Sequence, residues 1–93
     1  DNVTVEEGAT VNSSLIMPGA VIKKGASVQY AIVAENCVIQ EGANVGQRPE
    51  ETENLDNWGV AVVGADLTVG KNAKVKASVM LSADVKEGET VEK

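Results

Sequence analysis

The sequence predicts an all-β fold, a parallel β-helix in which the chain winds through short strands around a three-sided prism. Three observations support this prediction. Whole segments recur at a constant spacing, β-branched residues recur at every sixth position, and glycine or a small polar residue has a fixed place in each unit. Such internal repeats indicate stacked structural units, each of which contacts only its neighbours.

The 17-residue repeat appears when VEEGATVNSSLIMPGAV (5–21) is laid over IKKGASVQYAIVAENCV (22–38). A third copy begins with IQEGANV (39–45). After an intervening segment, VGKNAKVKASVMLSADV (69–85) has the same layout, and VKEGETV (85–91) begins another copy. We therefore expect about four to five coils, one for each copy of the repeat.

Each copy contains a six-residue unit that opens on a β-branched residue, and another β-branched residue follows six positions later: Val5/Val11, Ile22/Val28, Ile39/Val45, Val63/Val69, Val69/Val75 and Val85/Val91. The fourth position of each unit holds a type that adopts left-handed backbone at low cost: Gly8, Gly25, Gly42, Asp66, Asn72 and Gly88. Gly19 and Asn36 mark a second corner. Three short strands thus form one triangular coil, and coils stack at the spacing of paired strands, about 4.8 Å.

The composition agrees with a narrow interior. The chain has no Phe, one Tyr and one Trp, although 43% of its residues are hydrophobic. A compact helical or sandwich core would normally contain several large rings. Valine-rich runs broken by glycine at this spacing match neither a helical period nor helix propensity. A β-sandwich, with its longer strand spacing, would not explain the register of the glycines.

The net charge and the single cysteine indicate which ligands and which cellular location to expect. A net charge of −6 and a pI near 4.5 argue against nucleic-acid binding. Cys37 has no partner for a disulfide, which favours a reducing, cytoplasmic location and a role as a small buried hydrophobe. No apolar run reaches the roughly 20 residues of a membrane span, so no membrane partner is expected. Residues 1–93 are expected to form a single domain, a C-terminal fragment of a longer protein.

The repeat is interrupted once. After Val45 the chain reads GQRPEETENLDNWG, which matches no other copy, and the β-branched pattern returns at Val63. We interpret the interruption as a loop inserted at about 46–58. A solenoid tolerates an insertion at a corner because only its outside is disturbed.

The whole pattern resembles the hexapeptide-repeat left-handed β-helix family, and the left hand of the helix is implied by that resemblance. A narrower likeness covers residues 14–85. The run SLIMPGAVIKKGASVQYAIVAENCVIQEGANVGQ, then an acidic loop, then WGVAVVG, resembles the C-terminal end of bacterial glucose-1-phosphate adenylyltransferase (ADP-glucose pyrophosphorylase). Members of that family carry an insertion after an IGxx-type segment, here Val45-Gly46, and then a Gly-Ile-Val-like strand, here 59–63.

This resemblance implies a parent enzyme that makes ADP-glucose and pyrophosphate from ATP and glucose 1-phosphate with Mg²⁺, for glycogen synthesis. It also implies partners, namely the parent's own N-terminal catalytic domain and sister subunits. ATP and glucose 1-phosphate would bind the parent rather than this fragment, because no Gly-rich nucleotide loop occurs here. No catalytic residue, cofactor site or metal site is assigned to the fragment. The alternatives are the tail of another sugar-1-phosphate nucleotidyltransferase, a hexapeptide acyltransferase and a purely structural repeat protein.

Candidate chemistry is sparse. The chain has no His, so it lacks the general base of hexapeptide acyltransferases and the zinc ligands of β-helical carbonic anhydrases. The loop carboxylates Glu50, Glu51, Glu53 and Asp56 are expected to be solvated. Arg48, the only Arg, is a candidate effector-phosphate contact, against the simpler interpretation of a surface residue.

Trp58 is a candidate anchor for the loop or a candidate interface contact. Lys71, Lys74 and Lys76 are expected to balance nearby acidic groups. Where activated members of the family have a basic effector contact, this chain has Gly64-Ala65. We therefore expect a weakly regulated parent or a regulatory-type subunit.

Overall fold

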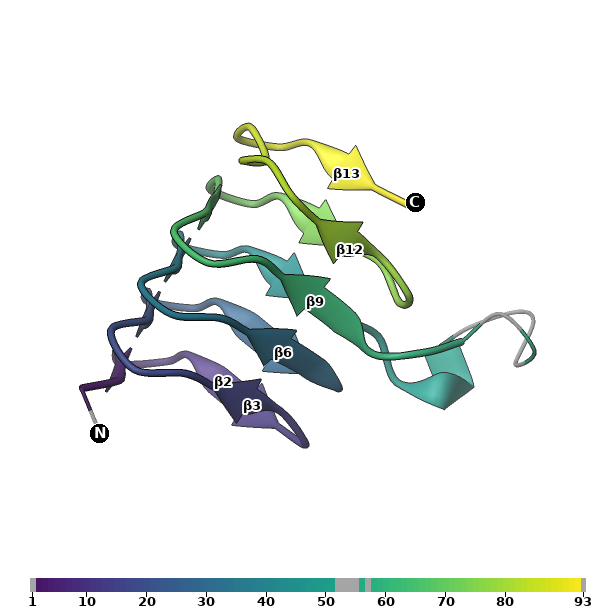
Figure 1. Ribbon diagram of the computed structural model, residues 1–93, viewed down its shortest axis with the longest axis horizontal. Helices are drawn as coiled ribbons and strands as arrows, with labels where there is room; N and C mark the ends of the chain where they lie inside the picture. Colours follow the sequence, from purple (N-terminus) through teal and green to yellow (C-terminus); the bar gives the residue numbers. More distant parts are fainter. Residues whose placement is uncertain (1, 52–55, 57, 93) are drawn as a thin grey trace.

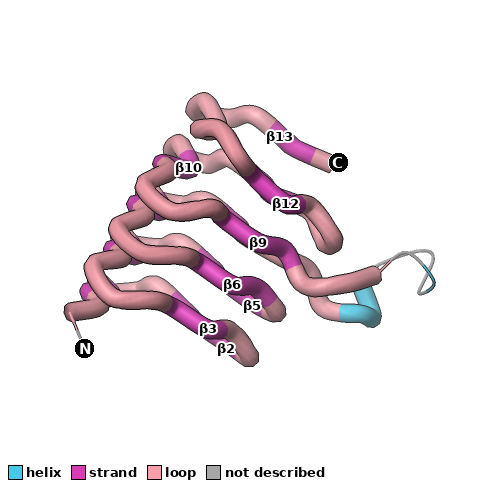
Figure 2. Tube along the Cα trace, viewed as in Figure 1, coloured by secondary structure: helices cyan, strands magenta, loops and turns pink. Residues whose placement is uncertain are grey.

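The protein is a left-handed parallel β-helix, and the computed structural model describes residues 2–51, 56 and 58–92 (Figure 1). Short strands alternate with turns around three flat sides (Figure 2). Sheet A contains β1 (Thr4–Val5), β4 (Val21–Ile22), β7 (Val38–Ile39) and β10 (Thr68–Val69). Sheet B contains β2 (Thr10–Asn12), β5 (Ser27–Gln29), β8 (Asn44–Val45), β11 (Lys74–Val75) and β13 (Thr90–Val91). Sheet C contains β3 (Leu15–Ile16), β6 (Ala31–Val33), β9 (Ala61–Val63) and β12 (Met80–Leu81).

All strand pairs are parallel, and the register confirms the predicted repeat in the first coils. Val5 pairs with Ile22 and Ile22 pairs with Ile39, so equivalent positions in these coils are the ones that the repeat aligns. The described residues form four coils and the start of a fifth, which contributes β13 and a bridge from Val85 to Val69.

The core consists of ladders of small and β-branched side chains that point into the prism. Ile22, Ile39 and Val69 are stacked neighbours in sheet A, and all three side chains are fully buried. Alanines line one corner from within, as Ala43 and Ala73 show. Among the described residues no polar or charged side chain is buried. The narrow section of the prism thus explains a core without Phe.

The predicted left-handed positions are confirmed, but Asp66, grouped by its spacing with the first corner, lies between β9 and β10 at the second corner, where it stacks on Asn36. Left-handed backbone occurs at every position that the pattern marked: Gly8, Gly19, Gly25, Asn36, Gly42, Asp66, Asn72 and Gly88. A third corner, which the sequence did not reveal, also has positive φ at Ser13, Tyr30, Gly46 and Ser78.

Gly25→Val should lower the free energy of unfolding by about 1–3 kcal/mol, because φ at Gly25 is +73° and a β-branched residue is strained there. Chemical denaturation followed by circular dichroism measures the loss. A variant with the wild-type midpoint would contradict the corner assignment.

The loop insertion lies where the sequence placed it. A coil of regular length would pair Arg48 with Ala31, but Ala61 of β9 takes that place, so the insertion delays the return to the stack. Val63 pairs with Val33 and is fully buried, and the stack therefore resumes in phase on sheet C as predicted. The inserted loop begins after β8 and contains the 3₁₀ helix η1 (Pro49–Glu51).

The last coil confirms the predicted start of a new copy at Val85 but not the regular length of the coil. Val69 pairs with Val85, whereas a regular coil would pair it with Lys86. Leu81 pairs with Val63, whereas a regular coil would pair Met80 there. This coil therefore gains one residue at the corner around Ser78 and loses two at the next corner.

A side chain compensates for the shortened corner. In the coil before it, the backbone N–H of Val38 donates to the backbone oxygen of Leu67. At the equivalent place in the last coil, the N–H of Thr68 donates to the Asp84 carboxylate at 2.9 Å. The hydrogen bond is thus kept with a carboxylate as its acceptor in place of a backbone oxygen, so Asp84 allows the coil to close in fewer residues.

Cys37 is a buried core residue, as predicted. Its thiol donates to the backbone oxygen of Gly64 at 2.9 Å. Burial raises the pKa of the Cys37 thiol, and the neutral form of the side chain is therefore favoured.

Candidate functional site

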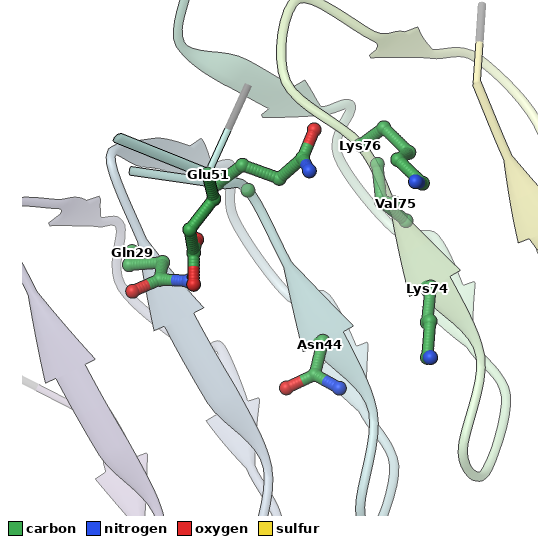
Figure 3. Close-up of a pocket in the computed structure, with 8 residues that line it drawn as sticks. Gln29, Asn44, Glu51, Lys74, Val75 and Lys76 are labelled. Atoms are coloured by element: carbon green, nitrogen blue, oxygen red, sulfur yellow. The ribbon is translucent and has the colours of Figure 1, made fainter. Parts of the chain in front are cut away.

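A polar groove lies on the outer face of sheet B at the base of the inserted loop (Figure 3). It has a volume of about 320 Å³ and is lined by Gln29, Asn44, Gly46, Gln47, Glu51, Lys74, Val75 and Lys76. Asn44 and Lys74 are paired neighbours on β8 and β11, so their side chains emerge side by side. The groove thus combines a flat wall of strand side chains with a rim made by the loop.

Gly46 sets the direction in which the chain leaves the prism. It is buried and has φ of +86°. A Cβ atom there would overlap the backbone oxygen of Gln29. Only glycine combines this backbone conformation with such a close approach to a neighbouring coil. The loop therefore starts from a point that other residue types cannot occupy without displacement.

Gln47 joins the two ends of the loop to the next coil. Its backbone oxygen accepts a hydrogen bond of 2.7 Å from the Trp58 indole. Its side-chain oxygen accepts one of 2.9 Å from the backbone N–H of Ala77. Trp58 also makes an edge-to-face contact with Tyr30, with ring centroids 5.5 Å apart. Trp58 thus has the contacts expected of a loop anchor, and its role at an interface stays a prediction.

Arg48 belongs to a polar cluster with Gln29 and Glu51. The Arg48 Nε donates to the side-chain oxygen of Gln29 at 3.2 Å, and the Gln29 amide donates to Glu51 at 3.2 Å. The backbone N–H of Arg48 also donates to the Glu51 carboxylate at 2.9 Å. Glu51 is exposed, as expected, but its carboxylate also connects η1 to β5. An effector contact by Arg48 stays a prediction.

Arg48 and Trp58 contact two consecutive residues at one corner of the prism. Arg48 contacts Gln29, and Trp58 contacts Tyr30, the next residue along the chain. Of the other loop carboxylates, Glu50 and Asp56 are exposed, as expected, and Glu53 lies outside the described residues. Gly64 and Ala65 follow β9 at the end opposite the loop, and neither supplies a cation.

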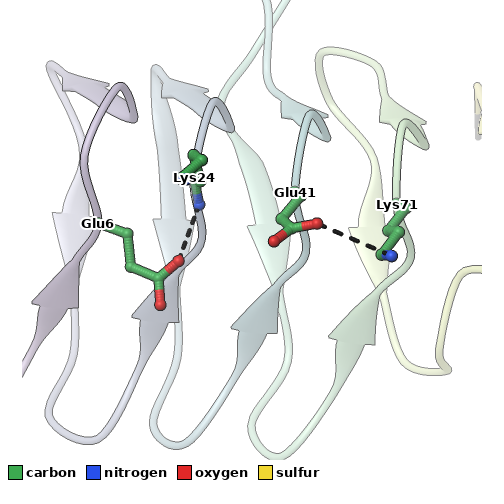
Figure 4. Close-up of polar contacts among 4 residues, drawn as sticks. All are labelled: Glu6, Lys24, Glu41 and Lys71. Carbon is green, nitrogen blue, oxygen red and sulfur yellow. Dashed lines mark hydrogen bonds and ion pairs between the residues drawn. The ribbon is translucent and has the colours of Figure 1, made fainter.

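The three lysines Lys71, Lys74 and Lys76 lie in two different environments. The Lys71 ammonium lies 3.8 Å from Glu41, as expected of a residue that balances an acidic neighbour (Figure 4). Both side chains are about half exposed, so the pair contributes little to stability. Glu6 accepts a hydrogen bond of 3.0 Å from the backbone N–H of Lys24 on the same side of the stack. Lys74 and Lys76 instead line the groove (Figure 3).

The groove has the chemistry of a binding surface. Its two ammonium groups and its side-chain amides can donate hydrogen bonds to an anionic or hydroxylated molecule. The described residues include no group of three His, Cys, Asp or Glu that could hold a metal ion. Nor does this part of the chain contain a helix long and apolar enough to cross a membrane.

Sequence reasoning missed Gln29, Tyr30 and Gln47. Two signals were available for the first pair. Gln29-Tyr30 replaces Asn12-Ser13 of the preceding coil, and Tyr30 is the only Tyr in the chain. Nothing in the sequence marks Gln47, because its partners Trp58 and Ala77 are 11 and 30 residues away.

Comparison with known families gives one match. The family described as GlmU-like, C-terminal hexapeptide, matches residues 1–58, which is more than half of the chain and includes the inserted loop. No match is found among curated proteins. The family match agrees with the parallel coils, the glycine corners and the valine ladders described above. This chain belongs to the GlmU-like family of C-terminal hexapeptide domains.

Proposed function

We propose that this chain is the C-terminal β-helix domain of a sugar-1-phosphate nucleotidyltransferase, and more narrowly of glucose-1-phosphate adenylyltransferase. The parent enzyme makes ADP-glucose and pyrophosphate from ATP and glucose 1-phosphate, in the cytoplasm, for glycogen synthesis. The role of the β-helix is to associate subunits and to position the N-terminal catalytic domains within an oligomer.

The observation that carries the proposal is the inserted loop with its in-phase return strand. The resemblance to the adenylyltransferase family rests on this same feature, an insertion after Val45-Gly46 and then the strand at 59–63. The chain leaves the stack after β8 and rejoins it at β9, in register with β6. Gly46, Gln47 and Trp58 hold the two ends of the loop together. These contacts fix both ends of the loop to the β-helix.

The parent reaction also requires Mg²⁺, and the described residues of this domain do not fit that ion. Mg²⁺ needs several oxygen ligands that converge on one point. No such cluster of carboxylates occurs in the described part of the chain. The proposal therefore assigns the metal and both substrates to the catalytic domain, and this domain performs no step of the reaction.

An assay of the full-length gene product tests the proposal. With glucose 1-phosphate and Mg²⁺, we expect pyrophosphate release with ATP to exceed release with UTP or dTTP at least tenfold, roughly 1.4 kcal/mol in transition-state binding. The 93-residue chain alone is the control and should release none. A preference for another nucleotide would overturn the ADP-glucose assignment. The absence of nucleotidyl transfer with every nucleotide would overturn the wider proposal.

The same assay tests regulation. Because Gly64-Ala65 stands where a basic effector contact is expected, fructose 1,6-bisphosphate should change the rate only slightly. Strong activation would contradict that expectation without affecting the substrate assignment.

A further inference from the structure

The polar groove on sheet B carries charges of opposite sign on its two sides. Lys74 and Lys76 belong to the chain segment of β11 on one side, and Glu51 of η1 lies on the other, beside Gln29 (Figure 3). In the described part of the chain, no carboxylate lies within ion-pair distance of either lysine ammonium. The groove therefore contains two cations and one anion that do not form ion pairs with one another.

The strand register explains the hollow between the two sides. Val45 pairs with Val28 on one side and with Val75 on the other. The next residues along these three segments, which form the following row, are Gln29, Gly46 and Lys76. Gly46 contributes no side chain to that row. The space between its two ends, which lie two strand spacings or about 10 Å apart, therefore stays open.

Glu51 is held in position with one oxygen left over. Its Oε1 atom accepts hydrogen bonds from the Gln29 amide at 3.2 Å and from the backbone N–H of Arg48 at 2.9 Å. None of the described residues donates a hydrogen bond to Oε2. The orientation of the carboxylate is thus fixed before any ligand arrives, which lowers the entropic cost of binding to Oε2.

Two side-chain amides add neutral hydrogen-bonding groups to the groove. The side-chain oxygen of Gln47 accepts from the backbone N–H of Ala77, so its amide nitrogen keeps two hydrogens for another acceptor. Asn44 is exposed and lies between the two charged sides (Figure 3). These amides can bind a carboxylate between the lysines and Glu51.

We propose that this groove binds a free acidic amino acid of the glutamate type. Two ammonium groups and one carboxylate, +2 and −1, give the groove a net charge of +1. Glutamate carries the complementary set, two carboxylates and one ammonium group. Its carboxylates accept hydrogen bonds from Lys74 and Lys76, and its ammonium group donates to Oε2 of Glu51.

Glu51 argues against a simple anion as the ligand. A phosphate group has no cation for this carboxylate, so its binding would bring like charges together. The net charge of −6 on the whole chain also disfavours a ligand with several negative charges. The volume of about 320 Å³ is at the small end for a ligand pocket and suits a small metabolite.

A titration followed by ¹H–¹⁵N NMR tests the site on the 93-residue chain. L-glutamate should shift the side-chain amide signals of Asn44 and Gln47, with a dissociation constant on the order of 1 mM because the charges are exposed. Glutarate lacks the ammonium group, and 4-aminobutyrate lacks the α-carboxylate. Each should bind at least about threefold more weakly than L-glutamate.

Two variants assign the contacts. Glu51→Gln should weaken L-glutamate at least about threefold and leave glutarate unchanged or bound more tightly, since only L-glutamate loses a charge partner. Its matched control is Glu50→Gln, the same change at an exposed neighbour on η1 that does not line the groove. Lys76→Gln should weaken both ligands, whereas Lys71→Gln, outside the groove, should weaken neither.

Several results would overturn the proposal. One is the absence of shifts at Asn44 and Gln47 up to about 20 mM L-glutamate. Another is equal affinity for L-glutamate and glutarate in the wild-type chain. Tighter binding of inorganic phosphate or fructose 1,6-bisphosphate than of L-glutamate would indicate a plain anion site instead. None of these results depends on nucleotidyl transfer, so this proposal and the proposed function fail separately.

Discussion

Ile39→Ala is expected to lower the free energy of unfolding by about 2–5 kcal/mol, a large part of the stability of a small domain. Ile39 is fully buried, and it lies between Ile22 and Val69 in the central ladder of sheet A. The backbones above and below are fixed by strand pairing at about 4.8 Å, so the coils cannot move together to fill the cavity. Urea denaturation followed by circular dichroism gives the midpoint and the slope from which the loss is calculated.

Val38→Ala is the control for this prediction. Val38 precedes Ile39 in β7, but its side chain is only half-buried and points away from the core. Its truncation should cost under about 1 kcal/mol, since little apolar surface leaves contact with the protein. Equal losses for the two variants would contradict the assignment of inner and outer sides in sheet A.

Gly46→Ala is expected to have the second large effect, a loss of about 2–4 kcal/mol in the free energy of unfolding. Two costs combine at this position. Alanine is strained at φ of +86°, and its Cβ would overlap the backbone oxygen of Gln29. The chain must then move at the point where the loop leaves the prism. Because Gln29 contributes to the groove, the rearrangement should also reach the loop.

Gly25→Ala separates the two costs. Gly25 has φ of +73°, but the nearest atom to a Cβ there is 4.0 Å away. Its loss should therefore reflect backbone strain alone, about 1 kcal/mol. Thermal melts of both variants supply the comparison, and the fluorescence of the single Trp reports on the loop. If Gly46→Ala were no more destabilising than Gly25→Ala, the close approach at Gln29 would not constrain the loop.

The sequence predicted the elements whose cause is local. Gly, Asn and Asp are the residue types that adopt left-handed backbone most easily, so two of the three corners could be identified from residue type and spacing. The inward ladders could be identified for a similar reason. Val and Ile recur at positions that must face a thin interior, and Ala recurs at the corner.

The third corner had only one such residue, Gly46, in the copy that the loop interrupts. Ser and Tyr rarely adopt positive φ, yet Ser13, Tyr30 and Ser78 all do. Their conformation is imposed by the strands on either side, which are paired with neighbouring coils. The start of the last copy at Val85 was predicted, but the long and short corners that lead to it were not, because the short corner depends on the Asp84 carboxylate standing in for a backbone oxygen. The contribution of one side chain to one hydrogen bond leaves no trace in a repeat pattern.

The candidate site was predicted only in part. The inserted loop was located, and Arg48 and Trp58 were identified within it. Their contacts were not, since the cluster of Gln29, Arg48 and Glu51 joins segments that are distant in the sequence. Those contacts exist because the loop folds back onto an earlier coil, and the repeat carries no information about how a segment outside it will fold.

By itself, the sequence determined the all-β class, the triangular coils, the place of the inserted loop and the apolar ladders within. These follow from residue type at regular spacing, because each coil contacts only its neighbours. Only the tertiary structure decided which outward residues become neighbours. The loop, the long corner and the short corner change the spacing between coils, so that Ile32 meets Val62 and Val62 meets Met80 outside the regular repeat. This apolar row on sheet C and the polar groove on sheet B arise from that stacking, since side chains far apart in sequence share a surface only after the coils are in register.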